Sequence, residues 1–168
     1  HKKVLKKFTS RLLKRTKLLR LGDGLKKTTD VGPIINESQR QKILSYCKIG
    51  VEEGAKLLFG GNIYKKGICR DGFFFEPTLF AGVSPKMRIA QEEIFGPVLS
   101  ILECKSLENA VDIVNDSRFG LSSAIYTRDV NRAFKAIEKL DTGITYINSS
   151  TIGAEVQLPF GGTKGTGN

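Results

Sequence analysis

The sequence predicts an α/β fold, an open and largely parallel twisted sheet with helices on both faces. Between residues 98 and 147, three apolar segments of strand length alternate with two segments whose apolar residues recur at helical spacing. Strands joined by such helices form βαβ units with parallel strands. The 168 residues are one domain's worth of chain, and 40% hydrophobic and 26% charged residues suit a globular protein with a buried core.

The first predicted element is a helix over residues 4–21, which Gly22-Asp23-Gly24 ends. A connector follows, and a second helix begins at Asn36 or Glu37 and ends at Gly54. Most apolar residues of the first helix recur at helical spacing: Val4, Leu5, Phe8, Leu12, Leu13, Leu19 and Leu21. The second helix carries a predicted buried stripe of Ile43, Leu44, Cys47 and Val51.

A short strand is expected over residues 55–59, closed by Gly60-Gly61, and residues 62–72 form a surface loop. Residues 73–80 read as extended chain with a proline break. Residues 98–104 then form the first strand of the alternating region.

The rest of the alternating region begins with a helix over residues 107–115, with Ser106 as its N-cap. A strand over residues 121–126 follows. Asp129 caps the last helix, and residues 143–147 form the last strand. That helix carries the apolar residues Ala133, Phe134, Ile137 and Leu140. Residues 148–168 are a glycine-rich C-terminal loop segment.

The net charge of +10 is concentrated at the N-terminus, because residues 1–22 hold nine Lys or Arg and no Asp or Glu. Such an arm suits nucleic acid or an anionic membrane, but the apolar stripe within it favours the solvated face of a packed helix. No segment has the length and hydropathy of a membrane span, and no signal peptide is recognisable.

The three cysteines, Cys47, Cys69 and Cys104, are widely spaced, and the single histidine is His1. This spacing predicts no metal site and fits a reducing compartment, which we expect to be the cytoplasm. We expect each cysteine to be a small buried hydrophobic residue.

The octapeptide Gln91-Glu92-Glu93-Ile94-Phe95-Gly96-Pro97-Val98 is the most informative segment. It places two carboxylates before a turn and beside an aromatic ring. A carboxylate can accept hydrogen bonds from a sugar diol, and the ring can pack on a flat heterocycle. The segment therefore predicts half of a nucleotide-cofactor site.

Seven segments of the chain resemble, in order, motifs from the C-terminal part of the aldehyde dehydrogenase family's catalytic domain. They are Asp30-Val31-Gly32-Pro33, Glu53 to Leu58 with Gly60-Gly61, Gly72 to Leu79, the octapeptide, Asn115-Asp116 with Phe119-Gly120-Leu121, Asp141-Thr142-Gly143 with Asn148, and Pro159 to Lys164. The resemblance covers residues 4–168 and implies that residues 1–168 form one partial catalytic domain.

The resemblance also implies roles for individual residues. Glu93 is expected to accept hydrogen bonds from the nicotinamide ribose of NAD or NADP, and Phe95 to pack near the nicotinamide ring. Phe160 is expected either to line the aldehyde pocket or to pack in the core. Glu155 is similar to a position in the branch acting on aminoadipate semialdehyde, where this neighbourhood helps to recognise the substrate; the alternative is a solvated loop residue.

The family oxidises aldehydes to carboxylic acids with a cysteine nucleophile, an asparagine oxyanion donor and a glutamate general base. In the family these groups and the dinucleotide-binding domain precede the segment matched here, and none of the three cysteines matches the nucleophile's motif. The resemblance therefore implies a C-terminal piece with no catalytic residue of its own, inactive alone and binding NAD or NADP weakly or not at all.

Two alternatives remain open. In the first, the chain is an interaction module that forms homo-oligomers or pairs with a missing N-terminal half through exposed apolar surface. The last-ranked alternative is a nucleic-acid binder that uses the basic arm, with Lys2, Lys3, Lys6 and Lys7 as contacts.

Overall fold

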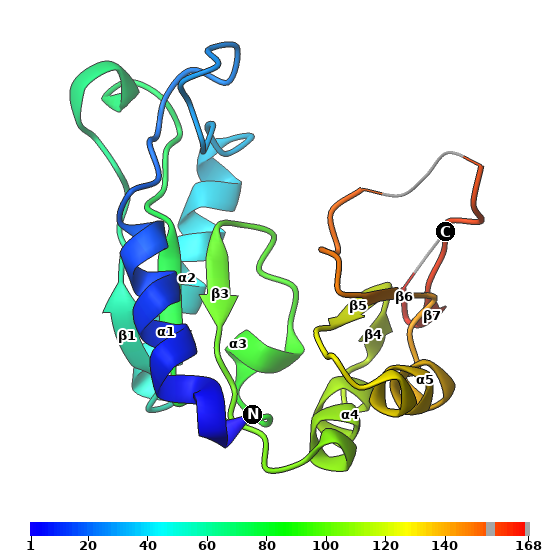
Figure 1. The fold of residues 1–168 in the computed structure, drawn as a ribbon. Coiled ribbons are helices and arrows are strands. Elements are labelled where there is room, and N and C mark those ends of the chain that lie inside the picture. Colours follow the sequence, from blue (N-terminus) through cyan, green and yellow to red (C-terminus); the bar gives the residue numbers. More distant parts are fainter. Residues whose placement is uncertain (154–156, 167–168) are drawn as a thin grey trace. The chain divides into compact units, whose positions relative to one another are not determined.

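The computed structural model describes residues 1–153 and 157–166. The fold is α/β, as the sequence predicts, and Figure 1 shows the order of its elements. Apart from His1, the chain divides into two compact units, Lys2–Glu103 and Cys104–Asn168. No helix among the described residues is long and apolar enough to cross a membrane.

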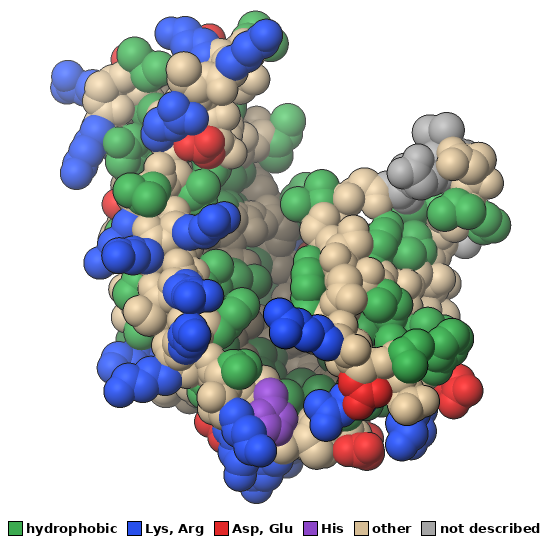
Figure 2. All heavy atoms as spheres, viewed as in Figure 1, with side chains coloured by type: hydrophobic (Ala, Val, Ile, Leu, Met, Phe, Trp, Pro, Cys, Tyr) green, Lys and Arg blue, Asp and Glu red, His purple; other side chains and the backbone are tan. Residues whose placement is uncertain are grey.

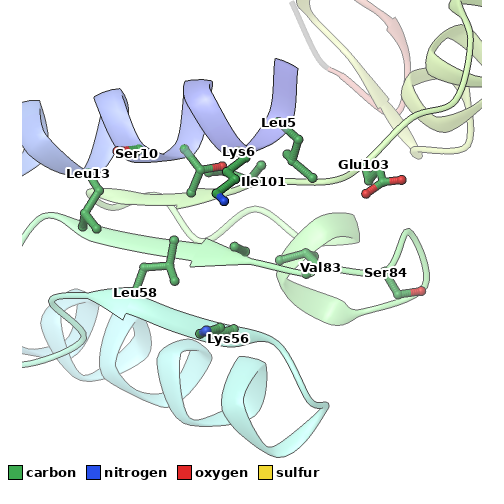
Figure 3. A pocket seen from close by; sticks show the side chains of 13 residues that line it. Leu5, Lys6, Ser10, Leu13, Lys56, Leu58, Val83, Ser84, Ile101 and Glu103 are labelled. Atoms are coloured by element: carbon green, nitrogen blue, oxygen red, sulfur yellow. The ribbon is translucent and has the colours of Figure 1, made fainter. Parts of the chain in front are cut away.

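The first unit is built on a three-stranded sheet of β1 (Lys56–Phe59), β2 (Thr78–Ala81) and β3 (Val98–Ser100), in that order. β1 pairs with β2 antiparallel, and β2 pairs with β3 in parallel. The helices α1 (Lys2–Thr16) and α2 (Glu37–Glu52) lie on opposite faces of this sheet (Figure 3). The unit also holds a short 3₁₀ helix (Gly67–Cys69) and α3 (Arg88–Gln91).

The core of the first unit lies between α2 and the sheet. The helix begins where predicted, because the Asn36 side chain accepts a hydrogen bond from the backbone N–H of Gln39 at 2.8 Å. Its buried face differs from the predicted stripe, since Val51 is exposed. The core cluster consists of Ile43, Tyr46, Cys47, Ala55, Phe75, Phe80, Val83, Ile89 and Ile94.

Helix α1 ends five residues before the predicted position of residue 21. The Asp30 N–H donates to the Arg20 carbonyl, and the Arg20 N–H and guanidinium both donate to the Asp30 carboxylate at 2.9 Å. Leu21 forms a bridge with Val31. These contacts hold residues 20–21 in extended chain, so the apolar pattern does not continue as helix.

No residue of α1 is fully buried. Leu5 and Leu13 are half-buried against the sheet, and a cleft of about 650 Å³ separates much of the helix from Leu58 and Val83 (Figure 3). The lysines and arginines of the helix cover its outer face (Figure 2). The predicted stripe therefore contacts the sheet only in part, and Phe8 is exposed.

The second unit contains α4 (Leu107–Asn115) and α5 (Val130–Lys139), which contact each other. β5 (Ser122–Ile125) pairs in parallel with β6 (Ile144–Ile147), and α5 connects them, so this part is the predicted βαβ unit. The short strands β4 (Phe119–Gly120) and β7 (Thr163–Lys164) pair antiparallel. The N-caps Ser106 and Asp129 are confirmed.

The apolar face of α5 is only partly buried. Ala133 and Ala136 are buried, but Phe134 is 61% exposed and Ile137 is also exposed. The apolar residues of this helix are therefore divided between the core and the surface. The predicted strand over residues 98–104 is shorter than expected and ends at Ser100.

Candidate functional site

The octapeptide connects α3 to β3 within the first unit. Glu92 follows the last residue of α3, and Val98 begins β3. The side chains between them alternate in environment, since Ile94 lies in the core whereas Glu93 and Phe95 are exposed. The loop therefore presents the two predicted cofactor contacts side by side in sequence and at the surface.

Glu92 is held by two residues of the same unit. The Tyr46 hydroxyl donates to Glu92 Oε2 at 2.6 Å, and the Arg88 guanidinium donates to both carboxylate oxygens at 2.9 Å. The hydrogen bond to Glu92 and burial raise the pKa of Tyr46. Hydrogen bonding to the same carboxylate raises the pKa of Arg88 above its ordinary value. Glu92 therefore serves to fix the start of the loop.

Glu93 differs from its neighbour in its surroundings. Its side chain is exposed, and among the described residues it makes no hydrogen bond or ion pair within the chain. A carboxylate in this position can accept hydrogen bonds from an external group. Glu92 thus has a structural role, whereas Glu93 is exposed at the surface.

Phe95 adopts a left-handed backbone conformation with φ +53°, and its side chain is 70% exposed. The Gln39 side-chain amide donates to the Ile94 carbonyl at 2.8 Å and to the Phe95 carbonyl at 2.9 Å. Gly96 packs closely on Ile43, so that a Cβ at this position would lie 2.6 Å from Ile43 Cγ1. The ring therefore faces solvent while its backbone is held from α2.

The predicted aldehyde-site residues belong to the second unit. Phe160 is 64% exposed and follows Pro159, which lines a cavity of about 540 Å³ together with Tyr146, Ile152 and Leu158. Phe160 itself is not among the residues that line this cavity. Glu155 lies outside the described residues.

The three cysteines are free thiols, and their environments bear on catalysis. Cys47 and Cys69 are buried, as predicted, and burial raises the pKa of both, that of Cys47 to about 11. Cys104 is only half-buried, which corrects the expectation for that residue. Because the thiolate is the nucleophilic form, burial disfavours nucleophilic chemistry at Cys47 and Cys69.

No group of three or more His, Cys, Asp or Glu side chains suited to a metal ion occurs in the part of the chain that the structure describes.

Sequence reasoning missed three residues that shape the octapeptide, namely Gln39, Tyr46 and Arg88. The four-residue spacing of Arg88 and Glu92 is typical of a helical ion pair and could have indicated their contact. Gln39 and Tyr46 lie 55 and 46 residues from their partners Ile94 and Glu92, and no local pattern connects such distant positions.

The chain is similar to parts of several known proteins. The chain is 42% identical over 161 residues to α-ketoglutaric semialdehyde dehydrogenase of Bacillus subtilis, covering 96% of the chain and 33% of that protein. It is 42% identical over 167 residues to betaine aldehyde dehydrogenase of Brucella melitensis, covering 99% of the chain and 34% of that protein. The chain thus spans about a third of the length of these curated relatives.

Solved structures are similar over the same extent. Betaine aldehyde dehydrogenase of Staphylococcus aureus in complex with NAD⁺ matches with a TM-score of 0.93 and 36% identity, over 96% of this chain and 32% of that one. HpcC from Thermus thermophilus matches with a TM-score of 0.94 and 38% identity, over 100% of this chain and 33% of that one. The model of the aldehyde dehydrogenase family matches residues 1–168. From this match along its whole length, the chain belongs to the aldehyde dehydrogenase family.

Proposed function

We propose that this chain provides the contact to the nicotinamide half of the cofactor in an NAD(P)-dependent aldehyde dehydrogenase, which oxidises an aldehyde to a carboxylic acid. The observation that supports this most is the division of the glutamate pair. Glu92 is occupied by Tyr46 and Arg88, whereas Glu93 is exposed beside the exposed ring of Phe95.

The residues present fit the cofactor. The Glu93 carboxylate would accept hydrogen bonds from the two hydroxyls of the nicotinamide ribose, and the Phe95 ring would pack near the nicotinamide. When bound, NAD(P)⁺ accepts the hydride that leaves the aldehyde carbon. The NAD⁺ complex of the Staphylococcus aureus relative supports a nicotinamide dinucleotide as the cofactor.

We assign Phe160 to the aldehyde pocket, in keeping with its exposed ring and its position beside the cavity-lining Pro159. The relatives are named for α-ketoglutaric semialdehyde and betaine aldehyde. Both aldehydes should therefore be tested as substrates. The first is anionic and the second is cationic, so Glu155 is the residue to substitute if one of them is preferred.

The 168 residues alone are expected to be inactive. Cys47 and Cys69 are buried thiols of raised pKa, and none of the three cysteines matches the family's nucleophile motif. NAD⁺ binding should also be weak, because Glu93 and Phe95 contact only one end of the cofactor. Turnover of betaine aldehyde by the purified chain, free of any full-length enzyme, would contradict this.

A chimera tests the role of Glu93. This chain replaces the matching 161 residues of the Bacillus subtilis relative, and the KM for NAD⁺ is measured for the chimera and its Glu93→Gln variant. Hydrogen bonds to a charged group contribute about 1.5–3 kcal/mol, so the KM should rise about tenfold or more. Glu103→Gln, which changes another exposed glutamate of the same unit, is the control. Equal effects of the two substitutions would overturn the assignment.

Association is a second candidate function, and α5 supports it. Val130, Phe134 and Ile137 are exposed at i, i+4 and i+7, which places them in one apolar stripe on the helix surface. Exposed apolar patches commonly mark interaction surfaces. We propose that this stripe mediates pairing with another copy of the chain or with the remainder of the enzyme.

Light scattering at several concentrations tests the pairing. Phe134→Lys should lower the association constant of the chain, or of a mixture with the N-terminal part of the Bacillus subtilis relative, by at least tenfold. Asn131→Lys adds the same charge to an exposed polar position of α5 and should leave association unchanged. Monomeric behaviour of the unsubstituted chain in both settings would rule the function out.

A further inference from the structure

One face of α2 contacts the octapeptide at three positions on successive turns. Gln39, Ile43 and Tyr46 are spaced by four and three residues, so they lie along the same side of the helix. Tyr46 binds Glu92, Ile43 packs on Gly96, and Gln39 binds the two carbonyls between them. This face therefore contacts the loop on both sides of Glu93.

Gln39 makes the contact closest to the exposed ring. Its amide nitrogen carries two hydrogens, which match the carbonyls of Ile94 and Phe95 at 2.8 and 2.9 Å. The base of the side chain is also fixed, because the Gln39 backbone N–H donates to Asn36 Oδ1 at 2.8 Å. The backbone of Gln39 and the amide group of its side chain are therefore each held by hydrogen bonds.

The two carbonyls flank a strained residue. A phenylalanine at φ +53° brings its Cβ close to backbone oxygen, and such residues persist only where surrounding contacts hold them. Rotation of Phe95 into the ordinary region of φ would turn its carbonyl away from Gln39. The paired hydrogen bonds therefore oppose this rotation directly.

The contacts at Glu92 cannot replace those of Gln39. Tyr46 and Arg88 hold the side chain of Glu92, three residues before Phe95 and on the other side of Glu93. They fix where the loop begins and leave the φ angle of Phe95 undetermined. Ile43 restricts Gly96 but donates no hydrogen bond.

We propose that Gln39 is a positioning residue that keeps Phe95 in the left-handed conformation and thereby sets the direction in which Glu93 and Phe95 are presented. Its consequence for cofactor binding rests on the proposed function of that pair. The conformational part stands on the geometry of residues 39, 94 and 95 alone.

The conformational part is tested on the chain itself by NMR. The three-bond coupling between the amide and α protons of residue 95, with its Cα and Cβ shifts, reports whether φ is positive or negative. In Gln39→Leu, which keeps the bulk and removes both donors, these signals should move to values of negative φ. Gln41→Leu is the matched control, because Gln41 lies on the same helix and its side chain binds Glu37 rather than the loop.

A second substitution separates strain from general loosening. Phe95→Asn, combined with Gln39→Leu, should restore the positive-φ signals, because asparagine tolerates this region far better than phenylalanine. Unchanged residue-95 signals in folded Gln39→Leu would overturn the proposal. Failure of the rescue would also overturn it, since strain at Phe95 would then not be what Gln39 opposes.

The functional consequence is measured in the chimera described above. Gln39→Leu should raise the KM for NAD⁺ about fivefold, and Gln41→Leu should change it less than twofold. If Glu93→Gln raises the KM but Gln39→Leu does not, the positioning role fails while the proposed function stands. If Glu93→Gln has no effect, the proposed function fails, and the NMR result alone decides whether Gln39 holds Phe95.

Discussion

Gly96→Ala should destabilise the first unit by a steric clash with α2. The added Cβ would lie 2.6 Å from Ile43 Cγ1 and closer still to Cδ1, whereas carbon atoms normally approach to about 3.5–4.0 Å. Ile43 is fully buried in the core cluster, where side chains are close-packed. The conflict must therefore be relieved by moving the loop or the helix.

The magnitude follows from two opposing terms. Overpacking of a core costs about 1–3 kcal/mol. Replacing glycine by alanine at an ordinary φ raises the free energy of unfolding by about 0.4–1 kcal/mol, because it restricts the unfolded chain. Gly96 does not have a positive φ, so the net loss in the free energy of unfolding should be about 1.5 kcal/mol. With an m value of about 1.5 kcal/mol/M, the urea midpoint should fall by about 1 M.

Urea unfolding followed by circular dichroism at 222 nm measures the loss, and a double-mutant cycle locates it. Ile43→Val removes Cδ1, the nearest atom, and leaves Cγ1 in place, so it should relieve part of the clash and reduce the cost of Gly96→Ala by about 0.5 kcal/mol. Gly24→Ala is the control, because a Cβ there meets no atom within 4 Å. The steric explanation is refuted if Gly96→Ala matches Gly24→Ala, or if its cost is the same in the Ile43→Val background.

Three further outcomes are expected. A hydrogen bond from Arg20 lowers the pKa of Asp30 to about 2, so stability from this pair is present above pH 3.8 and lost as the pH falls towards 2; in Asp30→Asn the urea midpoint should vary less over that range. With Ellman's reagent at pH 8, half-buried Cys104 should react at least tenfold faster than Cys47, whose pKa is raised to about 11 by burial; equal rates would show that the core opens readily. Ser106→Ala should cost about 1 kcal/mol, seen as a lower thermal midpoint, since the Ser106 hydroxyl caps α4; an unchanged midpoint would mean that the cap contributes nothing.

Local signals predicted much of the fold correctly. The helices that begin at Asn36, Ser106 and Asp129 each carry a capping side chain immediately before an amphipathic segment, so their starting points could be predicted from neighbouring residues. The end of α1 at Thr16 could not, because Arg20 and Leu21 pair with Asp30 and Val31, ten positions away, and no local pattern reports that pairing.

The candidate site, too, could be predicted only where local residues decide its structure. The structure places Glu93 and Phe95 at the surface of the octapeptide loop, and the roles assigned to them stay predictions until the substitutions above are made. The sequence contains no sign that Glu92 is bound and Glu93 is not, since the deciding partner Tyr46 lies 46 residues away. The exposed Phe134 likewise depends on what surrounds α5, which periodicity does not report.

The residues that shape the octapeptide loop all belong to Lys2–Glu103, whereas Phe160 belongs to the other compact unit. The groups proposed to recognise the cofactor and the aldehyde therefore lie in different stretches of the chain. On this proposal, substitutions within Cys104–Asn168 would alter the preferred aldehyde and leave the contacts of Gln39, Ile43 and Tyr46 intact. Exchange of that one segment would then change the substrate while the cofactor contact is kept.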